Sequence, residues 1–123
     1  MATAYIEQAV ADALIASAEV GALVEGRVYP LEPPQGATLP AVAYQRIETS
    51  PNYTLQGYGS ESVTLALSSF AADYALMKEL ALAVRKVLTA APFMATVRQE
   101  ADVYGEEVEF PHVRTEYLMQ QKN

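Results

Sequence analysis

Apolar residues recur every three or four positions in two stretches of the chain, residues 6–17 and 73–90. This spacing places them on one side of an α-helix, so each stretch is predicted to be an amphipathic helix. The apolar stripe of the second helix is Tyr74, Met77, Leu80, Ala81, Val84, Val87 and Leu88. Ser17 is expected to cap a further short helical turn that ends near Gly26, where a left-handed backbone fits.

Alternation of apolar and polar residues predicts strands at residues 41–49, 61–70, 94–103 and 112–120. In the last strand Val113, Thr115, Tyr117 and Met119 alternate with His112, Arg114, Glu116 and Leu118. In residues 94–103 the weaker alternation sets Val97, Gln99 and Ala101 against Thr96, Arg98, Glu100 and Asp102. Prolines and glycines predict a surface loop at residues 31–40 and a long hairpin loop at residues 50–59. Residues 27–30 form only a short extended piece.

The resulting order is helix, two strands, helix, two strands. It predicts a single α+β domain over residues 1–123, with an antiparallel sheet of about four strands. Each main helix has one apolar stripe, so we expect both to pack on the same face of that sheet.

Composition and charge narrow the function classes. The 123 residues include 15 acids and 8 bases, for a formal net charge of −7, which argues against a protein that wraps a phosphate backbone. The absence of cysteine excludes disulfides, Cys-ligated zinc and thiol catalysis. Neither a targeting segment nor an apolar run long enough to cross a bilayer is found. We therefore expect no membrane partner and a chain made in the cytosol.

An acidic segment near the C-terminus contains Glu100, Asp102, Glu106, Glu107 and Glu109. Clustered carboxylates are ligands for calcium, but the spacing lacks the Asp-x-Asp-x-Asp-Gly pattern of a calcium loop. The favoured interpretation is a solvated hairpin whose charges prevent edge-to-edge aggregation. A third interpretation is that the acids line a surface that must not hold DNA.

The residues assemble no recognisable catalytic or cofactor site. His112 follows Pro111 at a predicted strand start, which is typical of an ordinary edge residue. Residues 57–59 contain a Gly-x-Gly, but a strand is predicted where a dinucleotide site needs a helix. Strand carboxylates such as Glu48 and Glu61 leave acid–base or metal chemistry open without defining a pair. We predict no cofactor, no metal site and no catalytic residue.

Two segments carry the most distinctive motifs, LVEGRVYP at residues 23–30 and PQGATLPAVAYQR at residues 34–46. A helix with an A…y…a..la..vr..l pattern at residues 72–88 follows, and then a strand pair with acidic and tyrosine-bearing connections. In this order the motifs resemble the small tail completion proteins of long-tailed phages and prophages, also called tail-to-head joining or tail terminator proteins. The resemblance covers nearly the whole chain.

This resemblance implies a structural virion protein and not an enzyme. Such proteins look like subunits of a ring, usually six-membered, that caps the head-proximal end of the tail tube, ends tube polymerisation and joins tail to head. The implied partners are other copies of the chain, the tail tube protein and the head–tail connector protein. DNA would pass through the hole without sequence-specific binding. The implied location is the head-proximal end of the tail, and the host cytoplasm during assembly.

Other functions remain open at this point. A head-side adaptor or stopper would dock on the portal complex instead of the tube. An acidic metal-dependent enzyme would use the strand carboxylates. A cellular protein with the same fold is a third possibility.

Loop tyrosines indicate where a ring subunit would meet its neighbours, since tyrosine anchors protein–protein contacts well. Tyrosines that lie flat on their own domain explain the pattern equally. We predict that residues 50–59 and 104–110 supply ring and tube contacts. The candidate interface residues are Asn52, Tyr53, Tyr58, Tyr104, Glu106 and Glu107. The acidic excess is expected to line the hole, because six copies would carry 6 × −7 = −42 and would repel phosphates.

Overall fold

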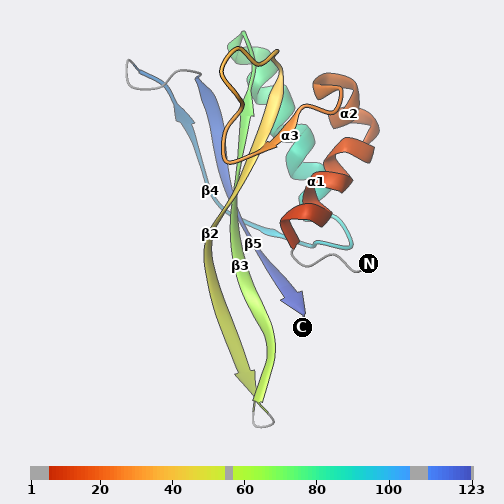
Figure 1. Cartoon of the computed structure of the whole chain (residues 1–123), viewed down its shortest axis with the longest axis vertical. Coiled ribbons are helices and arrows are strands. Elements are labelled where there is room, and N and C mark those ends of the chain that lie inside the picture. The colour runs from red at the N-terminus through yellow and green to blue at the C-terminus, as the bar shows by residue number, and fades with distance from the viewer. Residues whose placement is uncertain (1–5, 55–56, 106–110, 123) are drawn as a thin grey trace.

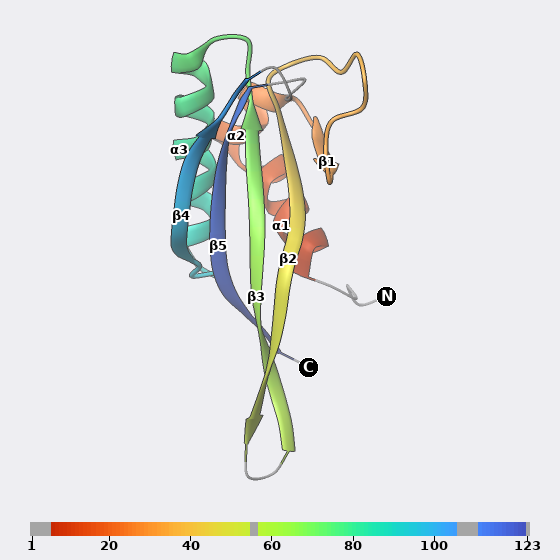
Figure 2. The ribbon, with the colours of Figure 1, turned by 90° about the vertical axis from the view of Figure 1, so that its left-hand side faces the viewer.

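A computed structural model describes residues 6–54, 57–105 and 111–122. One curved sheet carries a layer of helices on one of its faces (Figures 1 and 2). The helices are α1 (Ile6–Ala16), α2 (Ala18–Val24) and α3 (Tyr74–Thr89). The strands are β1 (Val28–Pro30), β2 (Ala41–Thr54), β3 (Gly57–Phe70), β4 (Thr96–Val103) and β5 (His112–Lys122). They form a 5-stranded sheet in the order β1-β2-β3-β5-β4.

The α+β class is confirmed, but the predicted antiparallel sheet of about four strands is wrong in strand number and order. Residues 28–30 form β1, which pairs in parallel with residues 42–44 of β2, so the sheet is mixed. A strand of three residues contains too little alternation to be recognised from its sequence. Arg27 Nε donates to the Pro40 carbonyl at 3.0 Å and ties together the two ends of the 31–40 connection.

The helix boundaries follow local signals, as predicted. Ser17 accepts a hydrogen bond from the Val20 backbone N–H at the start of α2, and Gly26, just beyond its end, has a φ of +85°. Asp73 caps α3, because its Oδ1 accepts from the Leu76 backbone N–H at 2.8 Å. No helix in the described part of the chain is long and apolar enough to cross a membrane.

The predicted hairpin loop at residues 50–59 is wrong, because most of it is strand. β2 and β3 remain paired as far as Thr54 and Gly57, and together they extend past the helix layer (Figure 1). We call residues 50–54 and 57–62 of this pair the ribbon. A ribbon that no helix covers needs no apolar alternation, and an edge strand tolerates Pro51. Its composition is therefore typical of a loop although its backbone is extended.

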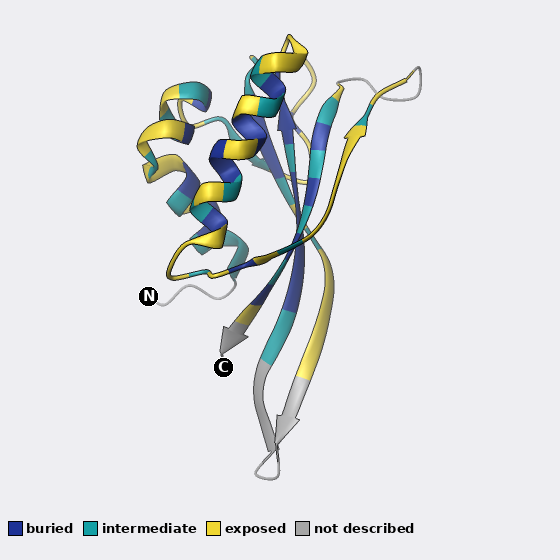
Figure 3. Cartoon of the chain, turned by 180° about the vertical axis from the view of Figure 1, so that it is seen from behind, coloured by how far each residue is buried: buried dark blue, intermediate teal, exposed yellow. Residues whose placement is uncertain are grey.

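The core lies between the sheet and the three helices (Figure 3). The predicted alternation of residues 112–120 is confirmed, since Val113, Thr115, Tyr117 and Met119 of β5 are all buried and the residues between them are not. Larger apolar side chains of β3 and α3 pack around them. These are Val63, Leu65, Leu67, Leu80, Val84 and Leu88. The predicted stripe of α3 is confirmed apart from its first residue, because Tyr74 is 57% exposed.

Truncation of the fully buried Leu80 to alanine is expected to lower the free energy of unfolding by about 2–5 kcal/mol, because it removes packed methyl groups and leaves a cavity. Leu82→Ala is the matched control on the same helix. Leu82 is 53% exposed, so its truncation should change the unfolding free energy by less than about 0.5 kcal/mol. Urea unfolding of both variants measures the difference. Equal losses would contradict the assigned orientation of α3.

Candidate interaction surfaces

The predicted interface residues near the C-terminus lie just after β4. Tyr104 directly follows the last residue of this strand and is 78% exposed. Glu106 and Glu107 fall outside the described residues. At this end of the sheet, Tyr104 therefore offers a large exposed aromatic surface for a partner.

The other predicted interface residues lie on the ribbon, at the opposite end of the sheet (Figure 2). Asn52 and Tyr53 belong to β2 and Tyr58 belongs to β3, where Tyr53 and Tyr58 are register partners. β3 spans the distance between the two ends, and its length corresponds to about 40 Å of extended chain. Tyr104 and the ribbon candidates therefore lie at opposite ends of the sheet and cannot form one contact patch.

Two strands, β2 and β5, have a neighbouring strand on both sides along only part of their length. Within the described residues β1 pairs with β2 from Val42 to Tyr44, so the edge of β2 has no partner strand beyond that point. On the other side of the sheet β4 first meets β5 where Thr96 pairs with Leu118, so the last residues of β5 have only β3 beside them. Uncovered backbone N–H and C=O groups can pair with a strand of another chain.

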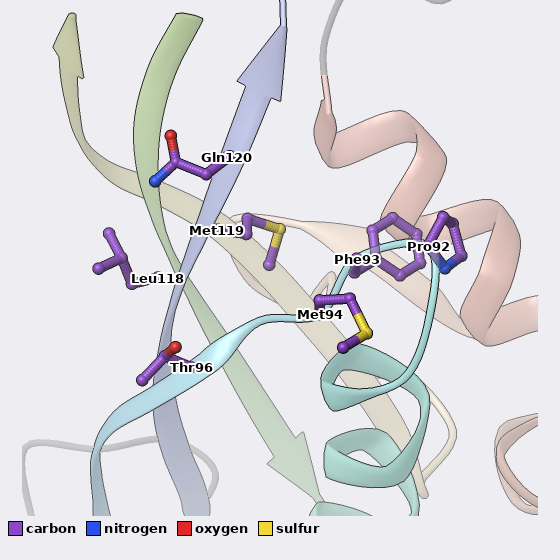
Figure 4. Close-up of a pocket in the computed structure, with 7 residues that line it drawn as sticks. All are labelled: Pro92, Phe93, Met94, Thr96, Leu118, Met119 and Gln120. Atoms are coloured by element: carbon purple, nitrogen blue, oxygen red, sulfur yellow. The ribbon is translucent and has the colours of Figure 1, made fainter. Parts of the chain in front are cut away.

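An open apolar groove of about 430 Å³ adjoins the uncovered end of β5. It is lined by Pro92, Phe93, Met94, Thr96, Leu118, Met119 and Gln120. In Figure 4 Leu118 and Thr96 lie on one side of β5, and Met119, Met94 and Phe93 lie on the other. Met94 is 67% exposed, so apolar surface is available beside a free strand edge. This combination suits an extended segment of a partner.

A β-bulge in β4 decides where its acids point. The register with β5 shifts between Val97 and Gln99, which makes Arg98 the extra residue. Glu100 and Asp102 consequently take the same side as Val97 and meet α3. The predicted faces of residues 94–103 are therefore wrong after Val97, because a single extra residue reverses the alternation.

Asp102 is held by two side chains of α3. Lys78 Nζ donates to Asp102 Oδ1 at 2.7 Å, and the Tyr74 hydroxyl donates to Oδ2 at 2.6 Å. The hydrogen bond from Lys78 holds the pKa of the Asp102 carboxyl below its usual value, and the same contact raises the pKa of Lys78. The contact thus stabilises the fold fully at neutral pH. Its stabilising effect is lost as pH falls through the lowered Asp102 pKa or rises through the raised Lys78 pKa.

Glu100 links the same helix to β5. Arg85 Nη2 lies 2.8 Å from Glu100 Oε1, which also accepts a hydrogen bond from Thr115 Oγ1 at 2.9 Å. Arg85 Nε and the Tyr117 hydroxyl are buried here without a hydrogen-bond partner in the described part of the chain. Burial raises the pKa of Tyr117 to about 12.

Glu100 and Asp102 are exposed, as the interpretation as a solvated hairpin expects, but both are also paired with α3. Residues 106, 107 and 109 lie outside the described part. Within residues 6–54, 57–105 and 111–122, no three potential metal ligands lie close enough to hold an ion.

His112 is not an edge residue, because β5 lies between β3 and β4. Its ring packs against Phe70, with 4.6 Å between the ring centroids. Together with its register partners Phe70 and Val103, His112 closes one end of the sheet. The His112 ring is thus part of the packing at this end of the sheet.

The groove at residues 92–94 and the exposed Ile47 of β2 were not predicted as interaction surfaces from the sequence. One signal was present in each case. Residues 92–94 form an apolar run directly after a helix stop, and Ile47 lies in a strand whose two faces are both mixed. The exposure of residues 92–94 and of Ile47 depends on where the neighbouring strand ends, and no local sequence pattern encodes that end.

Comparison with known proteins gives a family and a fold. A family model described as tail completion protein gp17 matches residues 8–119. A chain of the solved structure "Virion of native gene transfer agent (GTA) particle" is similar in fold, with a TM-score of 0.74 and 20% sequence identity. The similarity covers 93% of this chain and 92% of that chain. A search of the curated proteins finds no match.

Replacement of Glu100 by alanine is expected to lower the free energy of unfolding by about 1–3 kcal/mol, because Arg85 and the buried Thr115 lose their acceptor. Glu79→Ala is the control, since Glu79 is an exposed acid of α3 without an ion-pair partner among the described residues. Its replacement should change stability by less than about 0.5 kcal/mol. Urea unfolding near neutral pH tests both values. A Glu100→Ala variant as stable as the control would contradict the role of Glu100 as the acceptor for Arg85 and Thr115.

Above pH 10, Tyr117 is expected to make the fold less stable as pH rises. The unfolded chain loses the phenolic proton near pH 10, whereas the folded chain keeps it to about 12. The difference corresponds to about 2–3 kcal/mol. Tyr117→Phe should remove this part of the alkaline loss, which is measured by urea unfolding between pH 9 and pH 12. Tyr104→Phe, at an exposed position, should follow the unmodified protein. Parallel pH profiles for all three proteins would refute the assignment.

Proposed function

Because this chain belongs to the family of tail completion protein gp17, whose members are structural phage virion proteins and not enzymes, we propose that it caps the head-proximal end of the tail tube as one subunit of a ring. In this role it ends tail polymerisation and joins the tail to the head. The observation that carries the proposal is the family match over residues 8–119. The structure with the similar fold is that of a gene transfer agent virion, which is consistent with this proposal.

The uncovered strand edges support the ring. A closed ring of identical subunits needs two different surfaces that meet when the next copy is added. This chain has such surfaces on opposite sides of its sheet, the edge of β2 beyond Tyr44 and the end of β5 beyond Leu118. A ring of six, usual for proteins of this kind, is the expected size.

The two groups of candidate interface residues support contacts with two partners. Tyr104 lies at one end of the sheet and is followed in the sequence by Glu106 and Glu107, and the ribbon with Asn52, Tyr53 and Tyr58 lies at the other end. In our proposal one end meets the tail tube protein and the other meets the head–tail connector protein. A protein placed between tube and head needs both.

The distribution of charge supports passage of DNA without specific binding. The chain has a net charge of −7. All of its arginines and lysines whose side chains are described make an ion pair or hydrogen bond, except Arg98. Binding to a phosphate backbone draws its free energy from several free cations that displace counterions. A subunit with so few free cations should let DNA slide through the hole.

A shortened ribbon is expected to leave a folded protein that no longer caps tubes. In the variant an Asn-Gly pair joins Pro51 directly to Glu61, which are register partners and which such a two-residue turn can connect. None of the residues that form the described core is removed. The free energy of unfolding should therefore stay within about 1 kcal/mol of the original.

Electron microscopy of particles assembled with this variant as their only source of the protein measures tail length and the joining of tails to heads. Overlong or unjoined tails are the expected result, and normal joined tails would overturn the role of the ribbon. Leu82→Ala, on the exposed side of α3, is the control and should give normal particles. A head-side adaptor would instead leave tails of normal length and act at the portal, so tail length separates the two roles.

A further inference from the structure

Among the described residues, Arg98 has no ion-pair or hydrogen-bond partner, whereas the other described arginines and lysines do. Every other arginine or lysine with a described side chain contacts an acid or a carbonyl of its own chain. Arg98 is exposed, is the extra residue of the β4 bulge, and lies two positions from Thr96, which lines the apolar groove. The groove thus combines apolar lining residues with a free strand edge, and Arg98 lies near it in β4.

Ile47 and Glu48 of β2 have the complementary properties. Ile47 is 41% exposed although it lies in a strand, and the register shift between Arg46 and Glu48 makes it the extra residue of a second bulge. Glu48 is exposed and has no ion-pair partner in the described part of the chain. Both residues lie beyond the point where β1 stops covering β2.

The register places these two surfaces at the same height on opposite edges of the sheet. Glu48 pairs with Thr64, Thr64 pairs with Leu118, and Leu118 pairs with Thr96. β2 and β5 are both antiparallel to β3 and therefore run parallel to each other, about 10 Å apart across it. A second copy displaced sideways across the strands would thus bring its β2 edge to the free end of β5 in parallel orientation.

We propose that the β2 edge of one copy docks in the groove of the next copy, with Ile47 against Met94 and Glu48 paired to Arg98. The inference rests on the proposed ring and identifies its subunit contact. Repetition of this contact joins different patches in the same sense, which is the arrangement that closes a ring. It also leaves the ribbon on one face of the ring and the β4–β5 connection on the other.

Cysteine crosslinking tests the contact directly, because the chain contains no cysteine of its own. Ile47→Cys is placed on one tagged chain and Met94→Cys on a second, and the two are mixed under mild oxidation, both as purified protein and during particle assembly. A disulfide that joins the two chains is the expected product. Leu82→Cys replaces Met94→Cys in the control and should give none, since Leu82 is an exposed residue in the middle of α3 and does not line the groove. No crosslink between positions 47 and 94 in either setting, or an equal yield with Leu82→Cys, would overturn the proposal.

Charge reversal distinguishes a specific contact from random collision. Glu48→Arg on the first chain or Arg98→Glu on the second should each lower the yield about tenfold or more, because like charges then face each other. The two changes together should restore it, and failure to restore would overturn the pairing. Circular dichroism checks that each variant is folded.

The outcome is separable from that of the proposed function. Normal tail capping by a Glu48→Arg, Arg98→Glu and Ile47→Asp triple variant would show that the ring uses another contact, while the capping role itself stands. Crosslinking with no effect of the shortened ribbon on tails would uphold the contact and overturn the role of the ribbon.

Discussion

The backbone hydrogen bonds of β3 are the interaction on which the rest of the molecule depends. This strand pairs with β2 from end to end and with β5 from Ser60 to Phe70. Residues 63–67 are buried without interruption, so both of its faces are shielded along the centre. The helices pack onto one side of this three-stranded unit, and the outer strands β1 and β4 attach to its flanks. The two uncovered strand segments exist because these outer strands are shorter than the ones they cover.

β4 is attached to the sheet by backbone pairing with β5 and to the helix layer by ion pairs. Between Val97 and Val103 it is exposed, and its acids meet Lys78 and Arg85 of α3 in place of apolar packing. A solvent-exposed ion pair such as that of Lys78 and Asp102 contributes little stability by itself, so the backbone pairing holds most of the strand in place. The Tyr117 hydroxyl is buried without a hydrogen-bond partner among the described residues, where these polar groups meet the apolar core.

Much of the fold could be predicted from the sequence, because its main elements carry strong local patterns. The stripe of α3, the alternation of β5 and the caps at Ser17 and Asp73 all depend on neighbours within a few residues. The errors share a different cause. β1 is defined by a partner far along the chain, the bulge at Arg98 reverses a face through one extra residue, and the ribbon is extended without any apolar alternation. Pairing with distant strands determines each of these three features, and the local periodicity of the sequence does not reveal that pairing.

The candidate surfaces were harder to predict than the fold. Tyrosines in predicted loops were expected to be interface residues, and one of them, Tyr104, is highly exposed. The groove at residues 92–94 and the pair Ile47–Glu48 became visible only when the strand ends were known, because exposure there results from the absence of a neighbouring strand.

The ribbon has a consequence for how such a protein changes over generations. Its paired backbone extends past the helix layer (Figure 1). A surface segment of this kind varies more among related proteins than the elements that support it. Under the proposed role, a lineage can exchange one tail or head for another by rewriting this segment, while the body that carries it stays the same.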